Sequence, residues 1–473
     1  MGTMKQVLAP SDVETRSVDR VPHSERFGKS SDLGNIWFVG NVNLTAMATG
    51  VVAMSLGSNL IWTVIAVVLG SLFGTIFMAF HSAQGPQLGI PQLVQSRAQF
   101  GYIGAALTVW VFALANYITY NTSDAILSGS AMHEIFGIQS QFGFFIAAAI
   151  ATLIALYGYS LIHFLNKLLF WPSIVTLGVI TVGLYVKGNF PPGAFDLSNF
   201  DLSSFMTVFV IVAGFQLGWA PYVSDYSRYL PKEEGIRSTF WATYLASGLS
   251  AVWVFALGAI ASGPNGTHTP VTAVKIAGDS IFTGLGTVLL MILLLGLLLV
   301  MAINAYGGSL TMISMIDSFK KVNPTKAIRL VALLVMGFTV WGIAQFVGEE
   351  RFNAFYGNAL IFLAYLFTPW TAINLVDYFY VRKGVYVIGE IFNKDGIYGR
   401  WGWRGNTAYI VGFLSMVPFF VTTPYVGFIA KIVSDVDYSL FVGLFVSANV
   451  YLVLAKGIDR EKEAKMAATE GHF

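Results

Sequence analysis

The chain of 473 residues contains no cysteine and few charged residues. Without cysteine it cannot form a disulfide, a thiolate metal site or a cysteine nucleophile. Charged residues make up 11% of the chain, whereas soluble domains carry about 25% because they must hydrate a surface. The 27 Lys and Arg nearly balance the 25 Asp and Glu, and the net charge of +2 provides no basic surface for nucleic acid. These deficits exclude a soluble, disordered or nucleic-acid-binding protein.

Apolar residues are abundant instead: they make up 55% of the chain, and the mean hydropathy is +0.67. A helix of about 20 apolar residues crosses the hydrocarbon core of a bilayer. The sequence predicts twelve such spans, at 33–55, 58–80, 103–128, 142–163, 168–186, 204–222, 239–261, 286–315, 328–347, 353–381, 406–424 and 437–456. Residues 263–285 are expected to form an external loop with a short helix. The polar residues 1–32 lack the cleavage pattern of a signal peptide.

The distribution of positive charge predicts how the spans are oriented. Lys and Arg concentrate in the cytoplasmic connections of membrane proteins. With twelve spans and the N-terminus inside, all but four of the 27 Lys and Arg residues fall in the tails and inner connections. The exceptions are Lys187, Lys275, Arg351 and Lys431. The pattern predicts a multi-pass protein with both termini in the cytoplasm, located in the cytoplasmic (inner) membrane if the source is bacterial.

Several predicted spans contain amides, which lipid cannot satisfy by hydrogen bonding. They are Asn41, Asn43, Asn116, Asn121, Gln216 and Asn304. The stretches VGNVN at 39–43 and AGFQLGWAP at 213–221 interrupt the first and sixth spans with glycine and an amide. Breaks in two helices that are five spans apart are typical of transporters built from inverted repeats, where the freed backbone groups bind substrate and ion.

The sequence therefore predicts an all-α polytopic membrane protein with a five-plus-five inverted repeat, in which helices 1 and 6 are broken. The predicted parts are a cytoplasmic tail at 1–32, a first repeat at 33–187, a second repeat at 204–381, two appended helices at 406–456 and a cytoplasmic tail at 457–473.

Four stretches carry longer motifs: ETRSVDRVPHSERFG at 14–28, IWF at 36–38, WAPYVSDYSRYLP at 219–231 and DYFYVRKGVY at 377–386. Together they resemble the nucleobase–cation symporter-1 family, in its purine–cytosine permease branch. The resemblance extends over most of the chain, from the N-terminal tail to the last span. It implies a LeuT-like fold that works by alternating access.

The predicted cavity is aromatic, rich in amides and nearly uncharged, which suits a flat, neutral heterocycle with hydrogen-bonding edges. The resemblance implies that Trp219 stacks on the substrate, with Gly218 beside it. It also implies that Asn43 contacts the substrate from helix 1 and that Asn304 contacts it from helix 8. Gln216 adds an amide from helix 6.

Helix 3 contributes a further candidate pair, Tyr117 and Asn121, which lie four residues apart and so share one helical face. The family pairs an aromatic residue with an amide at this spacing, and Tyr117 stands where tryptophan is usual. After Asn304 the chain reads AYGGS, where many relatives have a Pro-Asn step. This departure leaves the choice among nucleobases open.

The resemblance also bears on the coupling ion, because sodium-coupled members bind sodium through helix 1 carbonyls and helix 8 hydroxyls. The residues at those positions are Val39, Val42, Ala302 and Ile303. Alanine and isoleucine offer no hydroxyl, and hard cations require several oxygen ligands, so proton coupling is favoured. A shift of register that brought Ser309 or Thr311 to this position would favour sodium instead.

Proton coupling requires a group that titrates, and Asp124 is the clearest charged residue inside a span. It lies three residues beyond Asn121, about 4.5 Å further along helix 3. A carboxyl group within the membrane is a functional candidate by default. The alternative is that Asp124 lies in an aqueous outer vestibule and only solvates the helix end.

The sequence thus predicts a secondary active importer of a neutral nucleobase, cytosine or a purine, that cotransports protons and needs no cofactor or metal. Sodium-coupled transport of hydantoin, allantoin or a vitamin-like heterocycle is the alternative. A channel or a membrane enzyme is disfavoured, because neither a filter segment nor a catalytic constellation is present. Its partners are a small heterocyclic substrate and the lipid bilayer, and the oligomeric state is left open.

Overall fold

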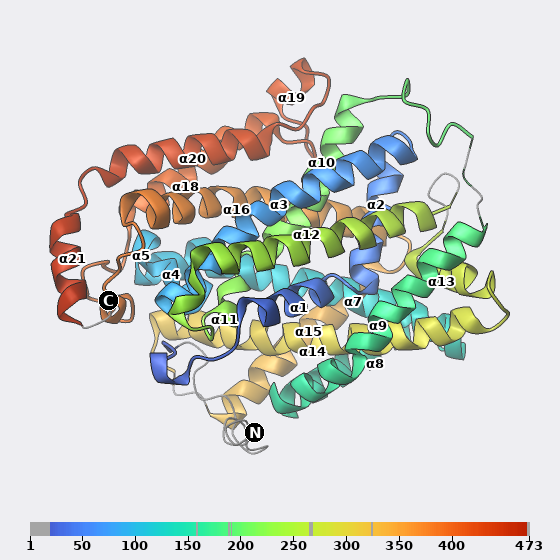
Figure 1. The fold of residues 1–473 in the computed structure, drawn as a ribbon, viewed down its shortest axis with the longest axis horizontal. Helices are drawn as coiled ribbons and strands as arrows, with labels where there is room; N and C mark the ends of the chain where they lie inside the picture. The colour runs from blue at the N-terminus through green and yellow to red at the C-terminus, as the bar shows by residue number, and fades with distance from the viewer. Residues whose placement is uncertain are drawn as a thin grey trace.

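The structure, a computed structural model, describes residues 19–157, 159–187, 190, 192–263, 268–322 and 325–470. Helices dominate these ranges, and most of them lie side by side along one direction (Figure 1). The long helices are α3 (Leu60–Leu88), α7 (Val111–Phe136), α8 (Ser140–Tyr157), α9 (Tyr159–Lys187), α10 (Leu202–Trp219), α12 (Gly235–Ala261), α14 (Leu285–Phe319), α15 (Lys326–Val347), α16 (Phe352–Val376), α18 (Trp403–Met416) and α20 (Ser439–Ala455). Each of the twelve predicted spans overlaps at least one helix, although the span predicted at 142–163 runs past the end of α8 into the start of α9.

Nine helical segments in the described ranges are long and apolar enough to cross a membrane, and up to eleven if each bent pair forms one span. One bent pair is α1 (Ser30–Gly40) with α2 (Leu44–Leu56), and the other is α20 with α21 (Arg460–Thr469). The predicted span at 406–424 is shorter than expected: α18 gives way to a 3-10 turn at Val417–Phe419. Pro418, inside that turn, has no N–H with which to continue the helix.

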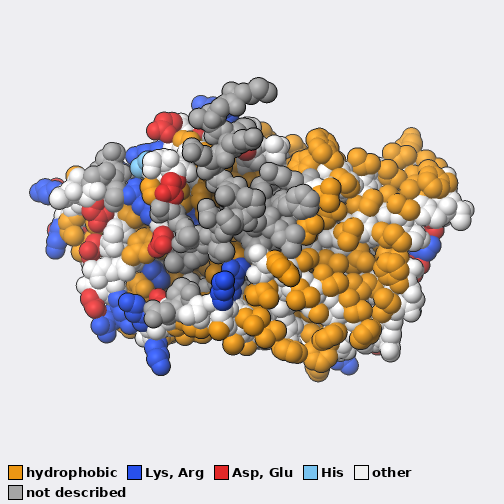
Figure 2. All heavy atoms as spheres, turned by 90° about the horizontal axis from the view of Figure 1, so that it is seen from below, with side chains coloured by type: hydrophobic (Ala, Val, Ile, Leu, Met, Phe, Trp, Pro, Cys, Tyr) orange, Lys and Arg blue, Asp and Glu red, His pale blue; other side chains and the backbone are white. Residues whose placement is uncertain are grey.

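The outer surface separates charge from apolar side chains. Figure 2 shows a broad hydrophobic band and, at one end of the molecule, a gathering of Lys, Arg, Asp and Glu. That end carries the short helices α5 (Arg97–Phe100), α11 (Val223–Ser227) and α21 (Figure 1). The external loop predicted at 263–285 contains the short helix α13 (Pro270–Asp279), at the opposite end. The band is the surface that lipid would cover.

The helices that surround the interior form two groups, each packed within itself. The pair α1/α2 packs with α3, α10 and α12, whereas α7 and α14 pack with α8 and α15. Helix α16 lies against α10 and also against the appended helices α18 and α20. The broken helices belong to the first group and α7 belongs to the second, so a site between the groups meets both breaks.

The break in the first span is held by one side chain. Helix α1 ends at Gly40, α2 begins at Leu44, and the two axes differ by 56°. The Asn43 amide nitrogen donates to the Gly40 carbonyl at 2.8 Å, and its oxygen accepts from the Ala46 N–H at 2.8 Å. Asn43 therefore caps both helix ends, which lipid could not do.

The break in the sixth span lies later than the sequence analysis placed it. Gly214 and Gln216 are interior residues of α10, which continues to Trp219, and α11 begins only at Val223. Pro221 ends the helix because it has no N–H to donate. The Ala220 N–H turns back to the Leu217 carbonyl at 3.1 Å, so the chain forms a tight turn before α11.

Helices α2 and α12 cross so closely that only glycine fits at the crossing. A Cβ atom at Gly258 would lie 2.0 Å from the Met47 carbonyl oxygen, and one at Gly50 would lie 1.9 Å from the Phe255 carbonyl oxygen. Both obstacles are backbone atoms, which cannot move aside without separating the helices. This crossing therefore fixes α2 against α12.

Gly258→Val is expected to lower the free energy of unfolding by at least about 1–3 kcal/mol, because it overpacks the crossing. The measurement is the melting temperature of the detergent-solubilised protein, followed by fluorescence size-exclusion chromatography. Gly342→Val in α15 is the control, because a Cβ atom there meets nothing within 4 Å. Equal melting temperatures for the two variants would contradict the close crossing.

Candidate functional site

A cavity lies where the two helix groups meet, and it encloses about 410 Å³ of space not filled by atoms, part of it open to solvent. Its lining residues are Asn43, Thr45, Asn116, Tyr117, Tyr120, Asp124, Phe215, Gly218, Trp219, Tyr222, Val300 and Asn304. They come from α2 and its cap, α7, the broken sixth span and α14.

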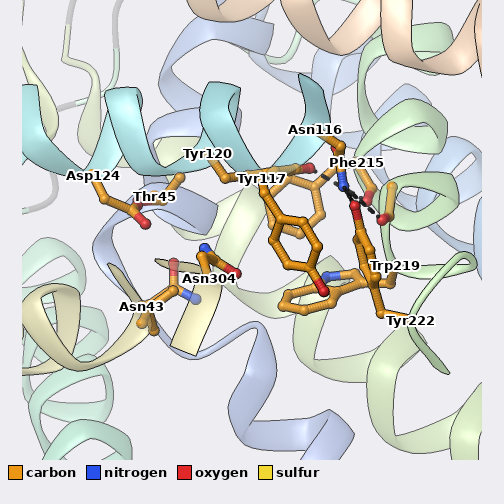
Figure 3. A pocket seen from close by; sticks show the side chains of 12 residues that line it. Asn43, Thr45, Asn116, Tyr117, Tyr120, Asp124, Phe215, Trp219, Tyr222 and Asn304 are labelled. Carbon is orange, nitrogen blue, oxygen red and sulfur yellow. Dashed lines mark hydrogen bonds between the residues drawn. The ribbon is translucent and has the colours of Figure 1, made fainter. Parts of the chain in front are cut away.

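One end of the cavity is aromatic (Figure 3). The rings of Tyr117 and Tyr222 lie 4.3 Å apart between centroids, and Tyr120 meets Phe215 edge-on at 5.5 Å. Trp219 lies at the same end, and its indole meets the indole of Trp37 in a T-shaped contact with 5.8 Å between the ring centroids. Such rings offer flat faces on which a planar ligand can stack.

The other end is polar, and there Asp124 faces Thr45 (Figure 3). The Thr45 hydroxyl donates to one carboxyl oxygen of Asp124. The second carboxyl oxygen is buried and has no partner among the described residues. The Asn304 side chain also forms no hydrogen bond within the part of the chain that the structure describes. The cavity thus holds an amide and a carboxyl oxygen that are free to meet a ligand.

The predicted substrate residues divide into two sets. Five of them line the cavity: Asn43, Tyr117, Gly218, Trp219 and Asn304. Asp124, predicted as an ion-coupling residue, lines it too and lies beside the predicted substrate residues, not in a separate vestibule.

Gln216 and Asn121 do not line the cavity, in contrast to the prediction. The Gln216 amide is fully buried among α3 and α12, where it donates to the Thr75 hydroxyl at 2.9 Å and the Ser247 carbonyl at 3.2 Å. The Asn121 amide donates to the Met301 carbonyl of α14 at 3.1 Å. Both amides join helices, which is the ordinary use of an amide inside a membrane protein.

The other ion-site candidates also lie outside the cavity lining, and they are Val39, Val42, Ala302 and Ile303. The Val39 carbonyl accepts the Val42 N–H at 2.8 Å, within the turn between α1 and α2. The Ser309 and Thr311 hydroxyls donate to carbonyls of their own helix at 2.8 and 2.9 Å.

The prediction missed Thr45, Tyr120, Tyr222 and Phe215, and it noted Asn116 only as one amide among several. Tyr120 could have been found, since it lies three residues after Tyr117 and four before Asp124 on one helical face. Tyr222 could not, because its position depends on the turn that follows Trp219. No group of three or more His, Cys, Asp or Glu side chains that could hold a metal ion occurs in the described ranges.

Known proteins that resemble this chain in sequence are permeases of one family. A family model described as a permease for cytosine/purines, uracil, thiamine and allantoin matches residues 20–443. The Bacillus subtilis protein YxlA, a purine-cytosine permease by name, is 35% identical over 445 residues, which cover 94% of this chain and 96% of YxlA. The purine-cytosine permease fcyB of Emericella nidulans is 24% identical over 469 residues, which cover 95% and 90% of the two chains.

Solved structures of the transporter Mhp1 share the fold. Its inward-facing form matches with a TM-score of 0.71 at 19% identity, over 98% of both chains. Its closed form with bromovinylhydantoin bound matches with a TM-score of 0.70 at 18% identity, over 99% of this chain and 100% of Mhp1. The matches confirm the prediction of a LeuT-like fold with broken helices 1 and 6, and the permease relatives identify a transporter and not an enzyme.

Gln216→Leu is expected to lower the free energy of unfolding by about 1–3 kcal/mol, because the variant leaves its buried partners without a donor. Asn304→Leu should leave that free energy nearly unchanged, because the Asn304 amide has no partner to lose among the described residues. Melting temperatures of the two variants in the same detergent test this. A larger loss for Asn304→Leu would contradict the placement of the two amides.

Proposed function

We propose that this chain imports a neutral nucleobase, cytosine or a purine, by symport with protons. The premise is that the chain belongs to the family of permeases for cytosine/purines, uracil, thiamine and allantoin. The supporting observation is a cavity that brings stacking rings together with unpaired polar groups. A planar heterocycle stacked on Trp219 or Tyr117 would gain about 1–3 kcal/mol per ring. Its edge would then reach Asn304, whose amide both donates and accepts.

The charge in the cavity supports a neutral substrate. Among the described residues that line the cavity, Asp124 is the only charged side chain, and no Lys or Arg accompanies it. An anionic substrate would meet an acidic group and no counter-charge, which desolvation makes costly. A neutral base, in contrast, brings no charge that the cavity must balance.

Asp124 is the residue to which we assign proton coupling. Its carboxyl group lies in the cavity wall between α7 and α2, and Thr45 of α2 is hydrogen-bonded to it. Protonation would remove the cavity's negative charge and add a hydrogen-bond donor. The substrate and the proton would then bind in one cavity, so each would favour the other and neither would be carried efficiently alone.

The orientation follows from the distribution of charge. The end that bears α5, α11 and α21 carries the gathered Lys and Arg residues, and it would face the cytoplasm by the positive-inside rule. Both termini would then be cytoplasmic, and the protein would span the cytoplasmic membrane. The Trp219 end of the cavity would be the deeper end for a substrate that arrives from outside.

Uptake of radiolabelled cytosine, adenine, hypoxanthine and allantoin tests the substrate and the ion together, in cells that express this chain. Sodium and external pH are varied independently. The expected result is saturable nucleobase uptake that survives sodium removal, rises at lower external pH and collapses with a protonophore. Strict sodium dependence would contradict the proton assignment, and uptake of allantoin alone would contradict the nucleobase assignment.

Asp124→Asn is expected to abolish accumulation against a gradient and to remove the pH dependence of the remaining exchange, because an amide cannot carry the proton. The measurement is counterflow and net uptake in proteoliposomes across a range of external pH. Asp279→Asn is the control, since Asp279 pairs with Lys275 in the α13 loop, far from the cavity. An unchanged pH profile in Asp124→Asn would contradict the assignment.

A further inference from the structure

The turn after α10 frees a backbone acceptor that a neighbouring helix must satisfy. In a continuous helix the Gly218 carbonyl would accept the Tyr222 N–H. Here the Tyr222 N–H donates to the Trp219 carbonyl at 3.0 Å instead. The Gly218 carbonyl is met by the side chain of Asn116, whose Nδ2 donates to it at 3.0 Å (Figure 3). A residue of α7 thus supports the break in the sixth span.

The same contacts fix the orientation of the Asn116 amide. Its Nδ2 also donates to the Tyr222 hydroxyl oxygen at 3.2 Å. That hydroxyl gives its own hydrogen to the Ala113 carbonyl at 2.6 Å, so it can only accept from Asn116. A flipped amide would place an oxygen against two acceptors. The NH2 group must therefore face Gly218 and Tyr222, and Oδ1 must point the other way.

The Oδ1 atom of Asn116 is left without a partner. The residue is 2% exposed, it lines the cavity, and its Oδ1 forms no hydrogen bond with the described part of the chain. A Cβ atom at Gly218 would lie only 3.3 Å from Oδ1 and 3.2 Å from the Tyr120 hydroxyl, so the glycine keeps a side chain of its own from crowding this acceptor. A buried acceptor without a partner is costly, and this one belongs to a residue of the cavity wall, where a ligand edge could supply the missing donor.

We propose that Asn116 is a specificity-determining residue whose Oδ1 accepts a hydrogen bond from an N–H group of the bound heterocycle. This inference rests on the proposed function and names the chemistry that the site selects. Because its NH2 group is already engaged, Asn116 offers only an acceptor. A ring edge with an N–H donor satisfies it, whereas an edge that presents a carbonyl oxygen or an N-methyl group leaves it unpaired. Nucleobases carry such N–H groups on ring nitrogens and exocyclic amines.

The test measures how cytosine and its derivatives methylated at N1 or dimethylated at the exocyclic amine, the two positions that carry N–H donors, compete with radiolabelled cytosine for uptake. If the wild type takes up a purine instead, that purine and its N-methyl derivatives are used. One derivative should bind the wild type about tenfold or more weakly than the parent base. Asn116→Leu keeps the side chain's size but has no acceptor. It should weaken the parent base while leaving that derivative unchanged, so that the two differ by less than about twofold.

Asn121→Leu is the matched control, because it removes a buried amide of the same helix that does not line the cavity. It should retain the wild-type preference for the parent base. If Asn116→Leu is not recovered folded from the membrane, Asn116→Ala takes its place in the same comparison. Undiminished discrimination in an Asn116 variant would overturn the inference while leaving the transport function in place. A wild type that takes up no nucleobase would overturn the proposed function itself, and this inference with it.

Discussion

The structure depends on one constraint: inside a bilayer, each backbone N–H and carbonyl group must find a partner within the protein. Continuous helices satisfy this on their own, but the two breaks at the cavity do not. Asn43 closes the first break from within its own chain segment. Asn116 closes the second from across the boundary between the helix groups. The breaks expose backbone to a ligand, and two amides stabilise them.

The two helix breaks also determine which side chains line each end of the cavity. The second break places Trp219 and Tyr222 at one end, whereas α2 and α7 bring Thr45 and Asp124 together at the other. Stacking faces therefore lie apart from the titratable group, and the amide of Asn304 lies between them (Figure 3). A ligand that fills the whole cavity must be flat at one end and polar at the other. Heterocyclic bases with hydrogen-bonding edges meet both demands.

Much of the fold could be predicted from the sequence, because hydrophobic runs of about 20 residues have few alternatives in a membrane protein. The break at Asn43 was also predictable, since a glycine and two amides interrupt an apolar run. The sixth span was harder to interpret. Gly214 and Gln216 resemble a break in sequence, yet α10 passes through them, because Gln216 finds its partners on α3 and α12. Only three-dimensional packing decides whether an amide joins helices or faces a cavity.

The dependence on packing also explains why only some residues of the candidate site could be predicted from the sequence. Trp219 and Tyr117 were identified from a motif and a helical spacing, and both line the cavity. Asn121 has the right spacing but turns towards Met301. Tyr222 and Asn116 depend on how a three-residue turn redirects hydrogen bonds, which no local pattern in the sequence encodes. The ion assignment stays a prediction.

The Asn43 cap has a consequence for motion. Its amide bonds Gly40 on one side of the bend and Ala46 on the other, so straightening or deepening the 56° bend would break a hydrogen bond that lipid cannot replace. We therefore expect α1 and α2 to keep their angle and to move together as one rigid piece. When the cavity opens towards one side of the membrane, α1 and α2 should swing as one angled piece. Flexing is then left to the segments at their outer ends.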